Sequence, residues 1–508
     1  MPTTIDNNKR IAKNTIYLYL RMLLTMSVGI YTSRIVLKTL GVSDFGVYNV
    51  MGGVIGMLGY VNTLLAGGTS RFLTIGLGEG NPAKLKLTFS TTFVLTMLTA
   101  GLVIVLGETI GLWFVNNYLN IAENRMEAAN WVYQCALISS ALTITQSPFT
   151  ASVISHEKMS IYAYMSILDA LMKLGIVYML LAFDFDKLKL YAFLMLVVNF
   201  IDIVIYRTYC IRKFAECAFS LKFDTDTFKK LFNFSGWNML GSLSAVLMNQ
   251  GVSIILNIFF GTVINAAKGV SNQVNNIVQQ LYSNFQLAAR PQIMKYYAQR
   301  QYDEMFKLMT NASKYCAFLL LCIIVPLLIN IRGLLHIWLV EVPDYSVAFI
   351  RLTLIYLLFR SIDEPLTAGI HAVGKMKLPN LTTAVINLLV FPITWIVCKM
   401  GGSPITANII FVIDAPIILS IDLWMLNRFI NFPVLKFLKN SVLPVISALT
   451  VSMILPLIVY SLTPTGIVSC LVNSAVSFIC VTVCIYFLFL PAHIKEKVNH
   501  TIINKIKK

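Results

Sequence analysis

The chain has 508 residues, of which 57% are hydrophobic and only 12% are charged, and its mean hydropathy is +0.74. An ordinary soluble protein carries about 25% charged residues, so this composition excludes a soluble globular protein. The net charge of +17 leaves two explanations, nucleic-acid binding and membrane topology, which the positions of the charges separate.

Apolar runs long enough to cross a bilayer, at ~17 to 25 residues each, recur along the whole chain. We count fourteen such runs. In chain order they cover residues 14–33, 47–70, 88–114, 128–153, 159–182, 190–206, 235–259, 269–289, 315–331, 346–370, 379–398, 404–427, 440–460 and 466–490. The longest connection has about 28 residues (207–234), which leaves no room for a soluble domain. The sequence therefore predicts an all-α polytopic membrane protein with about fourteen transmembrane helices.

Lysines and arginines gather on one side of this predicted topology. With both termini placed in the cytoplasm, the cytoplasmic segments hold 28 of these residues and the opposite side holds eight. Such a positive-inside bias sets the orientation of membrane proteins. The basic charge is therefore topological, both termini are expected in the cytoplasm, and no nucleic-acid partner is expected.

The sequence lacks the motifs of metal sites and nucleotide hydrolysis. Its nine cysteines form no CxxC pair, its five histidines form no metal-spaced set, and no GxxxxGK[ST] stretch occurs. We therefore expect no metal ion and no catalytic site, and the protein is not expected to be an enzyme.

Two halves of the chain match at an offset of 220 residues. GVSDFGVYNV (41–50) aligns with GTVINAAKGV (261–270), each between a first and a second span, and basic pairs precede both first spans. The common order predicts two six-helix repeats with the same membrane orientation, related by an axis along the membrane normal. The predicted lobes are residues 1–212 (spans 1–6) and 213–436 (spans 7–12). Residues 437–508 add spans 13 and 14 and a basic cytoplasmic tail.

Two stretches carry a family resemblance. NTIYLYLRMLLTMSVGIYTSRIVLKTLGVSDFGVYNV (14–50) and ARPQIMKYYAQRQYDEMFKLMTNASKY (289–315) resemble the polysaccharide branch of the multidrug/oligosaccharidyl-lipid/polysaccharide exporter superfamily. The resemblance extends over essentially the whole chain, including the number of spans. It implies a bacterial inner-membrane protein that flips polyprenyl-diphosphate-linked oligosaccharides, as in O-antigen or capsule assembly, and that works beside a polysaccharide polymerase and glycosyltransferases. It also implies a cavity lined by spans 1, 2, 7 and 8, and a groove for the polyprenyl tail on the last two spans.

The span at 269–289 carries eight side-chain amides between Asn272 and Gln286. Residues that are spaced by four and three positions lie on one face of a helix. In this helix they are Asn272, Asn276, Gln279, Ser283, Gln286 and Arg290. An amide that faces lipid without a partner costs several kcal/mol. Interhelical hydrogen bonds would employ two or three amides, whereas eight indicate a water-filled cavity. Neutral donors and acceptors suit the hydroxyl groups of a glycan substrate.

Three arginines are candidate ligands of the diphosphate. Arg21 lies about a third of the way into the first span, where an unpartnered cation costs at least ~2.5 kcal/mol. A guanidinium can bind phosphate oxygens through two parallel hydrogen bonds, although snorkelling to the cytoplasmic interface is the alternative for Arg21. Arg71 and Arg290 lie at the cytoplasmic ends of the second and eighth spans, where an ordinary positive-inside role is equally compatible.

Carboxylates inside the predicted spans are candidates for binding a coupling ion, H⁺ or Na⁺, and no other cofactor is expected. Because the resemblance places such a site in the C-terminal half, the candidates are Asp363, Glu364 and Asp414. Arg360 lies within one turn of the first two, so structural ion pairs are the alternative. Asp169 and Lys173 are likewise spaced as a structural pair.

The sequence and the resemblance together predict a flippase that moves polyprenyl-diphosphate-linked oligosaccharide to the periplasmic face by alternating access. One alternative is a cation-coupled drug antiporter of the same superfamily, which would need a carboxylate-rich cavity. Spans 1, 2, 7 and 8, however, contain no Asp or Glu. The other alternative is a membrane glycosyltransferase or polymerase, which would show acidic catalytic clusters or a large outward loop.

Overall fold

A computed structural model describes residues 4–59, 69–70, 72–74, 76–77, 81–156, 158–218, 223–375, 377–463, 466–490 and 495–496. Within these ranges the side chains of residues 4–21, 230–242 and a few single positions are not described. Every element assigned in the described ranges is a helix. The predicted all-α fold is therefore confirmed.

The described part of each predicted span falls on a helix, and the fourteen long helices that result agree with the prediction. The first two spans share α1 (Thr4–Gly59), which is broken at Gly41 with φ 76° and ψ 169°. A positive φ of this kind is accessible to glycine without strain. Gly261, the residue aligned with Gly41 in the repeat, has φ 79° and ψ −173° and separates α8 (Thr225–Phe260) from α9 (Thr262–Ala298). The two aligned glycines thus adopt one backbone conformation.

The remaining helices follow in chain order. They are α3 (Pro82–Leu106), which continues through the π-helical turn η1 (Gly107–Gly111) into α4 (Leu112–Tyr118), η2 (Glu123–Arg125), α5 (Met126–Ser155), α6 (Met159–Ala182), α7 (Lys187–Lys213), η3 (Ala215–Cys217), α10 (Tyr302–Trp338), α11 (Ser346–Val373), α12 (Lys377–Lys399), α13 (Ile405–Ile430), α14 (Val434–Phe437), η4 (Leu438–Val442), α15 (Leu443–Leu462), α16 (Ile467–Cys484) and η5 (Ile485–Phe489).

Capping side chains account for several of the helix starts. Asn81 accepts a hydrogen bond from the Lys84 N–H at 3.1 Å, and Asp224 accepts one from the Thr227 N–H at 2.8 Å. These carboxamide and carboxylate oxygens pair with N–H groups that have no partner within the helix. The cap residues therefore determine where α3 and α8 begin.

By length and composition, nine helical segments of the described ranges are apolar enough to cross a membrane. The long helices α1, α5, α9 and α11 are not among them. Of these, α5 is rich in serine and threonine, α9 carries the amides, and α11 carries charged side chains. A long helix with such a composition needs protein or water on its polar face. A polar site is therefore expected on α5, α9 and α11.

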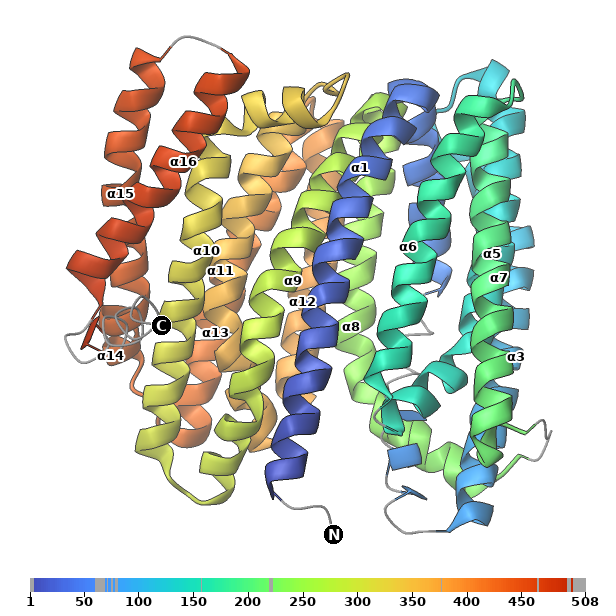
Figure 1. The fold of residues 1–508 in the computed structure, drawn as a ribbon, viewed down its shortest axis with the longest axis horizontal. Coiled ribbons are helices and arrows are strands. Elements are labelled where there is room, and N and C mark those ends of the chain that lie inside the picture. Colours follow the sequence, from blue (N-terminus) through green and yellow to red (C-terminus); the bar gives the residue numbers. More distant parts are fainter. Residues whose placement is uncertain are drawn as a thin grey trace. The chain divides into compact units, whose positions relative to one another are not determined.

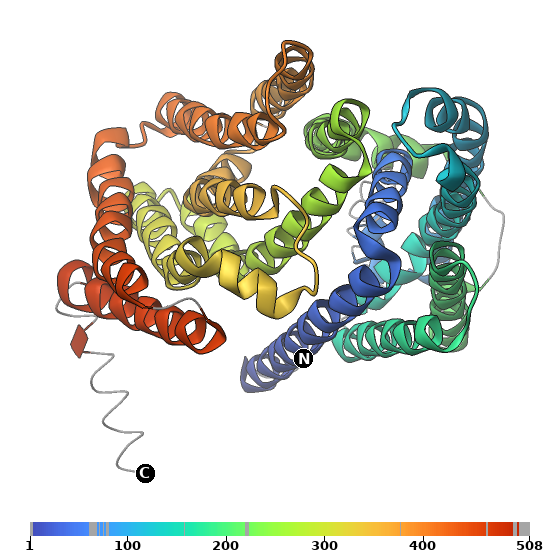
Figure 2. The same ribbon diagram turned by 90° about the horizontal axis from the view of Figure 1, so that it is seen from above.

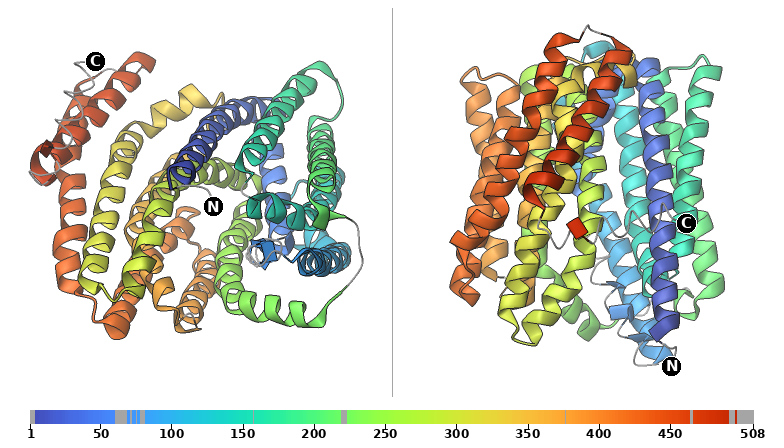
Figure 3. Two further views of the ribbon diagram at one scale, coloured as in Figure 1. Left: turned by 60° about the horizontal axis from the view of Figure 1, so that its bottom comes forward. Right: turned by 60° about the vertical axis from the view of Figure 1, so that its left-hand side comes forward.

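Contacts divide the chain into two compact units. Unit 1 comprises residues 1–269, 338–344 and 380–404, and unit 2 comprises residues 270–337, 345–379 and 405–508. Unit 1 therefore holds α8 and most of α12 in addition to the first six predicted spans, and the predicted lobes with boundaries at 212 and 436 stay a prediction. Within unit 1, α5 contacts α3 and α7, and α1 contacts α6 (Figures 1 and 2). Within unit 2, α11 packs on α13, and α15 and α16 form the antiparallel pair shown in red in Figure 3.

The second half of α1 meets the start of α9 closely within unit 1. A Cβ atom added to Gly46 would lie 1.9 Å from the carbonyl oxygen of Thr262. Nearby, the hydroxyl oxygens of Ser43 and Thr262 are 3.3 Å apart. Because the obstructing atom belongs to the backbone, a side-chain rotation cannot relieve the clash.

Gly46→Ala should destabilise the protein by about 1–3 kcal/mol, the usual cost of overpacking a close contact. Gly29→Ala is the matched control, because Gly29 lies in the same helix with no heavy atom within 4 Å of its added Cβ, and alanine favours a helix over glycine. The thermal unfolding midpoint of the purified protein should fall for Gly46→Ala only. Equal midpoints would show that α1 and α9 do not make this contact.

Candidate functional site

Unit 1 contains a cavity of about 560 Å³ between α1, α5, α6 and α7, lined in part by polar side chains. Small residues on α1 contribute to its wall: Gly52 has no neighbour within 4 Å of an added Cβ, whereas Gly59 lies directly against the Ser140 hydroxyl. The polar side chains of the lining are Tyr48, Ser139, Ser140, Thr143, Asp169, Lys173, Asn199 and Asp202. All of these except Tyr48 come from α5, α6 and α7, which were not predicted to line the transport route.

The charged groups of this cavity lie on α6 and α7. Lys173 Nζ is 2.7 Å from Asp169 Oδ2, which confirms the ion pair predicted from their spacing. Asp202 lines the same cavity, and its Oδ1 is buried with no hydrogen-bond partner among the described residues. The amide of Asn199 bridges to α5, donating to the Ser139 carbonyl at 3.0 Å and to the Thr143 hydroxyl at 3.1 Å. Asp202 and Asn199 were not singled out from sequence, although an acidic residue inside a span is itself a signal of function.

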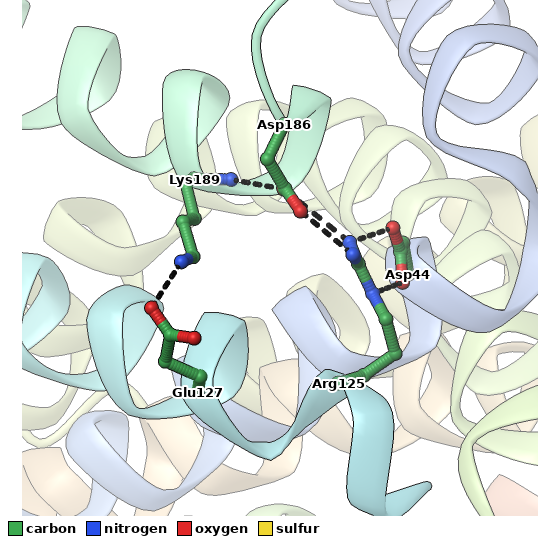
Figure 4. A network of polar contacts seen from close by, with 5 residues as sticks. All are labelled: Asp44, Arg125, Glu127, Asp186 and Lys189. Carbon is green, nitrogen blue, oxygen red and sulfur yellow. Dashed lines mark hydrogen bonds and ion pairs between the residues drawn. The ribbon is translucent and has the colours of Figure 1, made fainter.

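A network of ion pairs ties three helix ends together beside this cavity (Figure 4). Arg125 donates from Nε to Asp44 Oδ1 at 2.9 Å and from Nη1 to Asp186 Oδ2 at 2.7 Å, and its Nη2 contacts both carboxylates. Lys189 Nζ is 2.6 Å from Glu127 Oε1. Asp44 lies one helical turn before Tyr48 of the cavity wall, so the network holds α1 against α5 and α7 at that end.

The hydrogen bonds of this network determine the charge state of Asp186. Partial burial raises the pKa of Asp186, but hydrogen bonds from Arg125 and the Lys189 N–H, together with the charge of Arg125, outweigh it and keep the pKa below its ordinary 3.8. A carboxylate with a lowered pKa stabilises the folded state above its unfolded-state pKa. That stabilisation is lost as the pH falls through the folded-state value.

Unit 2 holds a second charged cluster, on α9, α11 and α13. Arg360 Nη1 donates to Asp363 Oδ2 at 2.7 Å, whereas Glu364 pairs with Arg290 of α9. Thr367 contacts Asp422 Oδ2 at 3.3 Å. Asp422, which is buried on α13, was overlooked from sequence although it too lies inside a predicted span.

Asp414 differs from the other carboxylates of this cluster. Its side chain is 4% exposed, and neither carboxylate oxygen has a hydrogen-bond partner among the described residues. A buried carboxylate without hydrogen bonds is costly when ionised. Of the three predicted coupling-ion residues, Asp414 alone lacks a paired cation among the described residues, because Asp363 and Glu364 are paired with Arg360 and Arg290.

The amide-rich part of α9 has one exposed and one buried face. Asn272, Asn276, Gln279 and Ser283 are exposed, whereas Val270, Val274, Val278 and Tyr282 are buried. Gln286 belongs to the buried row, and its Nε2 donates to the Ser361 carbonyl of α11 at 3.4 Å. Val270, Val274, Val278, Tyr282 and Gln286 are spaced by four residues. Each step of four turns 400° about the helix axis, so the buried row winds slowly around α9, by about 40° per step. The structure thus places Gln286 apart from the four exposed residues with which its spacing grouped it.

The described residues leave two predicted ligands without a structural test. The backbone of Arg21 belongs to α1, but the side chain of Arg21 is not described. Arg71 lies outside the described ranges. Arg290 is described and exposed, with its guanidinium on Glu364. The assignment of all three arginines to a phosphate site stays a prediction.

Asp186→Asn should lower the free energy of unfolding by roughly 1.5–3 kcal/mol at neutral pH, the range for hydrogen bonds to charged groups. Asparagine retains the cap on α7, so the change isolates the lost charge. The difference from wild type should shrink as the pH falls below 3.8. Thermal unfolding across pH checks this, with Glu127→Gln as the control, since 88% of the Glu127 side chain is exposed. A pH-independent difference would contradict the assigned charge state.

Single cysteines on α9 should report whether its amide face meets water. In a cysteine-free background, positions 272, 276, 279 and 283 should react with a polar thiol reagent at least tenfold faster than positions 270, 274 and 278. The exposed amides need water or protein partners, because lipid offers none. Uniformly slow labelling would mean that other protein segments cover this face.

No protein-family model matches the sequence, and no curated protein sequence matches it. Solved structures, however, share its fold. A structure of the lipid II flippase MurJ in an inward closed conformation aligns with a TM-score of 0.67 at 12% identity, covering 93% of this chain and 98% of that chain. An inward-facing multidrug resistance MATE-family transporter of the MOP superfamily aligns at 0.64 and 13% identity, covering 83% and 96%. A ligand-bound structure of the MATE multidrug transporter DinF-BH aligns at 0.61 and 14% identity, covering 83% and 95%.

Because these identities are low, the comparisons show the fold of the chain but do not identify its substrate. The fold they share with this chain is that of the superfamily whose motifs residues 14–50 and 289–315 resemble. The chain thus has the fold of the multidrug/oligosaccharidyl-lipid/polysaccharide exporters.

Proposed function

We propose that the protein is a flippase of the inner membrane that carries polyprenyl-diphosphate-linked oligosaccharide to the periplasmic face by alternating access. The observation that carries the proposal is the row of exposed polar side chains on α9, three amides (Asn272, Asn276 and Gln279) and the hydroxyl of Ser283. These neutral groups donate and accept hydrogen bonds, as the hydroxyl groups of a sugar require. The orientation rests on the 28 to eight distribution of basic residues.

The extent of the structural likeness supports a lipid-linked substrate. The MurJ structure aligns over 93% of this chain and the MATE transporters cited above over 83%, a difference of about 50 of the 508 residues. The segment from α14 to η5, Val434–Phe489, has a similar length. The lipid II flippase structure thus matches more of this chain than the two MATE transporters do.

A diphosphate in the transport route needs cationic partners. Arg290 is the described candidate, and its guanidinium is held by Glu364. The phosphate oxygens would replace the carboxylate of Glu364, since both accept two parallel hydrogen bonds from a guanidinium. Arg21 and Arg71 complete the proposed phosphate ligands on the strength of the sequence.

A cation-coupled antiporter is the second candidate function, and one observation favours it. Asp414 is a buried carboxylate without a hydrogen-bond partner in the described part of the chain, as a residue that takes up H⁺ or Na⁺ would be. The same residue serves a flippase whose cycle is driven by an ion gradient. Transport that keeps its full dependence on the ion gradient in Asp414→Asn would exclude this residue as the coupling site.

Asn276→Asp separates the two functions by adding a negative charge at nearly constant volume. Repulsion between this carboxylate and the diphosphate should lower glycan delivery to the cell surface at least about tenfold. Export of a cationic dye by an antiporter should instead be unchanged or faster. Both rates are measured at matched protein abundance in cells that lack the wild-type chain.

Asn117→Asp provides the matched control, because Asn117 is exposed near the end of α4, outside the proposed route. It adds the same charge and should leave glycan delivery within twofold of wild type. Normal delivery by Asn276→Asp, or an equal loss in both variants, would contradict the assignment of α9 to the substrate route.

A further inference from the structure

A second cavity lies in unit 2, between the start of α10 and the segment formed by α14, η4 and the start of α15. Its volume is about 530 Å³, and Figure 1 labels α14 at the lower end of α15. Four lysines line it: Lys307, Lys314, Lys436 and Lys439. The cavity is separate from the α9 face and is not used in the proposed transport route.

Positive charge in this cavity is only partly compensated. Lys307 pairs with Glu304, with Nζ and Oε1 2.8 Å apart, and Asp303 is the acidic residue of the lining. In the described part of the chain, the side chains of Lys436 and Lys439 form no ion pair or hydrogen bond. An excess of ammonium groups converging on one cavity, together with the side-chain amides of Asn311 and Asn440, suits an anion with several acceptor oxygens.

Aromatic contacts join the two segments that form the cavity, and Phe306 of this cluster lines it. The Phe306 ring on α10 packs edge-on against Phe432, with centroids 5.1 Å apart, and Phe432 lies 5.7 Å from Phe437 of α14. Phe432 and Phe437 are almost completely buried. These contacts fix α14 against α10, so the lysines of the two segments are held on one cavity.

Apolar side chains beside the lysines face outward. Leu435 is 83% exposed and Leu443 is 58% exposed, and both belong to the segment Val434–Leu462, which is long and apolar enough to span a bilayer. Exposed leucines at the start of such a segment contact acyl chains, whereas lysines at the same level reach the headgroups. A ligand that enters here meets ammonium groups and lipid-facing leucines together.

We propose that this cavity, which we call the lysine pocket (lined by Lys307, Lys314, Lys436 and Lys439), binds the phosphate headgroup of an anionic membrane lipid. The acyl or prenyl chains extend along the exposed leucines of α14 and α15, and the phosphate oxygens accept hydrogen bonds from Lys436 and Lys439. Basic pockets between membrane helices bind anionic headgroups elsewhere by the same physics. The inference does not depend on the proposed glycan transport, because it concerns equilibrium binding of a lipid.

Native mass spectrometry of the purified full chain, titrated with dioleoylphosphatidylglycerol, measures the first lipid-binding constant. In Lys436→Gln/Lys439→Gln this constant should weaken at least about tenfold, and in Lys436→Arg/Lys439→Arg it should be retained. Lys84→Gln/Lys86→Gln removes the same charge at the start of α3 and should stay within twofold of wild type. Equal weakening in the two glutamine variants, or no weakening in either, would overturn the proposal.

Competition identifies the source of the phosphate. If farnesyl diphosphate displaces phosphatidylglycerol at a concentration below that of the phosphatidylglycerol, the pocket is assigned to a polyprenyl-diphosphate lipid. Failure of farnesyl diphosphate to compete would assign it to the bulk anionic phospholipid. Inorganic pyrophosphate that competes as well as farnesyl diphosphate would show that the hydrocarbon contributes nothing, and would refute a lipid site.

Discussion

The constraint on which this structure depends is that lipid offers no hydrogen-bond partner to a polar group. A helix at membrane depth must therefore turn each amide, carboxylate or guanidinium toward protein or water. In α9, Gln286 meets this requirement through the Ser361 carbonyl, whereas Asn272 and Asn276 remain exposed. In α11, Asp363 and Glu364 meet it through arginines. The division between paired and exposed polar groups is what distinguishes structural contacts from a route for a polar substrate.

Helix number could be predicted from the sequence because the bilayer fixes the length of an apolar run. The pair of Asp169 and Lys173 could be predicted for a similarly local reason, since residues four apart lie on one helix face. Contacts between helices distant in the chain gave no such signal. The partner of Glu364 is Arg290, 74 residues away, and nothing in the spacing of either residue indicates it.

Helical periodicity also has a limit that Gln286 illustrates. Placing residues on an ideal wheel groups Gln286 with Asn272 and Asn276, because the wheel ignores where a neighbouring helix crosses. Packing follows rows of residues four apart, which wind around the helix axis. The partner helix α11 therefore covers Gln286 because of where it crosses α9, and not because of the polarity of that side chain. By contrast, the alignment of Gly41 with Gly261 succeeded because the backbone conformation of a break is a local property.

The ion pairs around Arg125 have a consequence for biosynthesis. Asp44, Arg125 and Asp186 belong to segments made at well-separated times, since 81 residues separate the first two and 61 separate the last two. Synthesis proceeds from the N-terminus, so Arg125 meets Asp44 first, and its second carboxylate arrives only when the start of α7 has emerged. Until then the ends of α1 and α5 are held together by one of the two ion pairs of Arg125. The nascent chain thus completes this joint only when the start of its sixth span has been made.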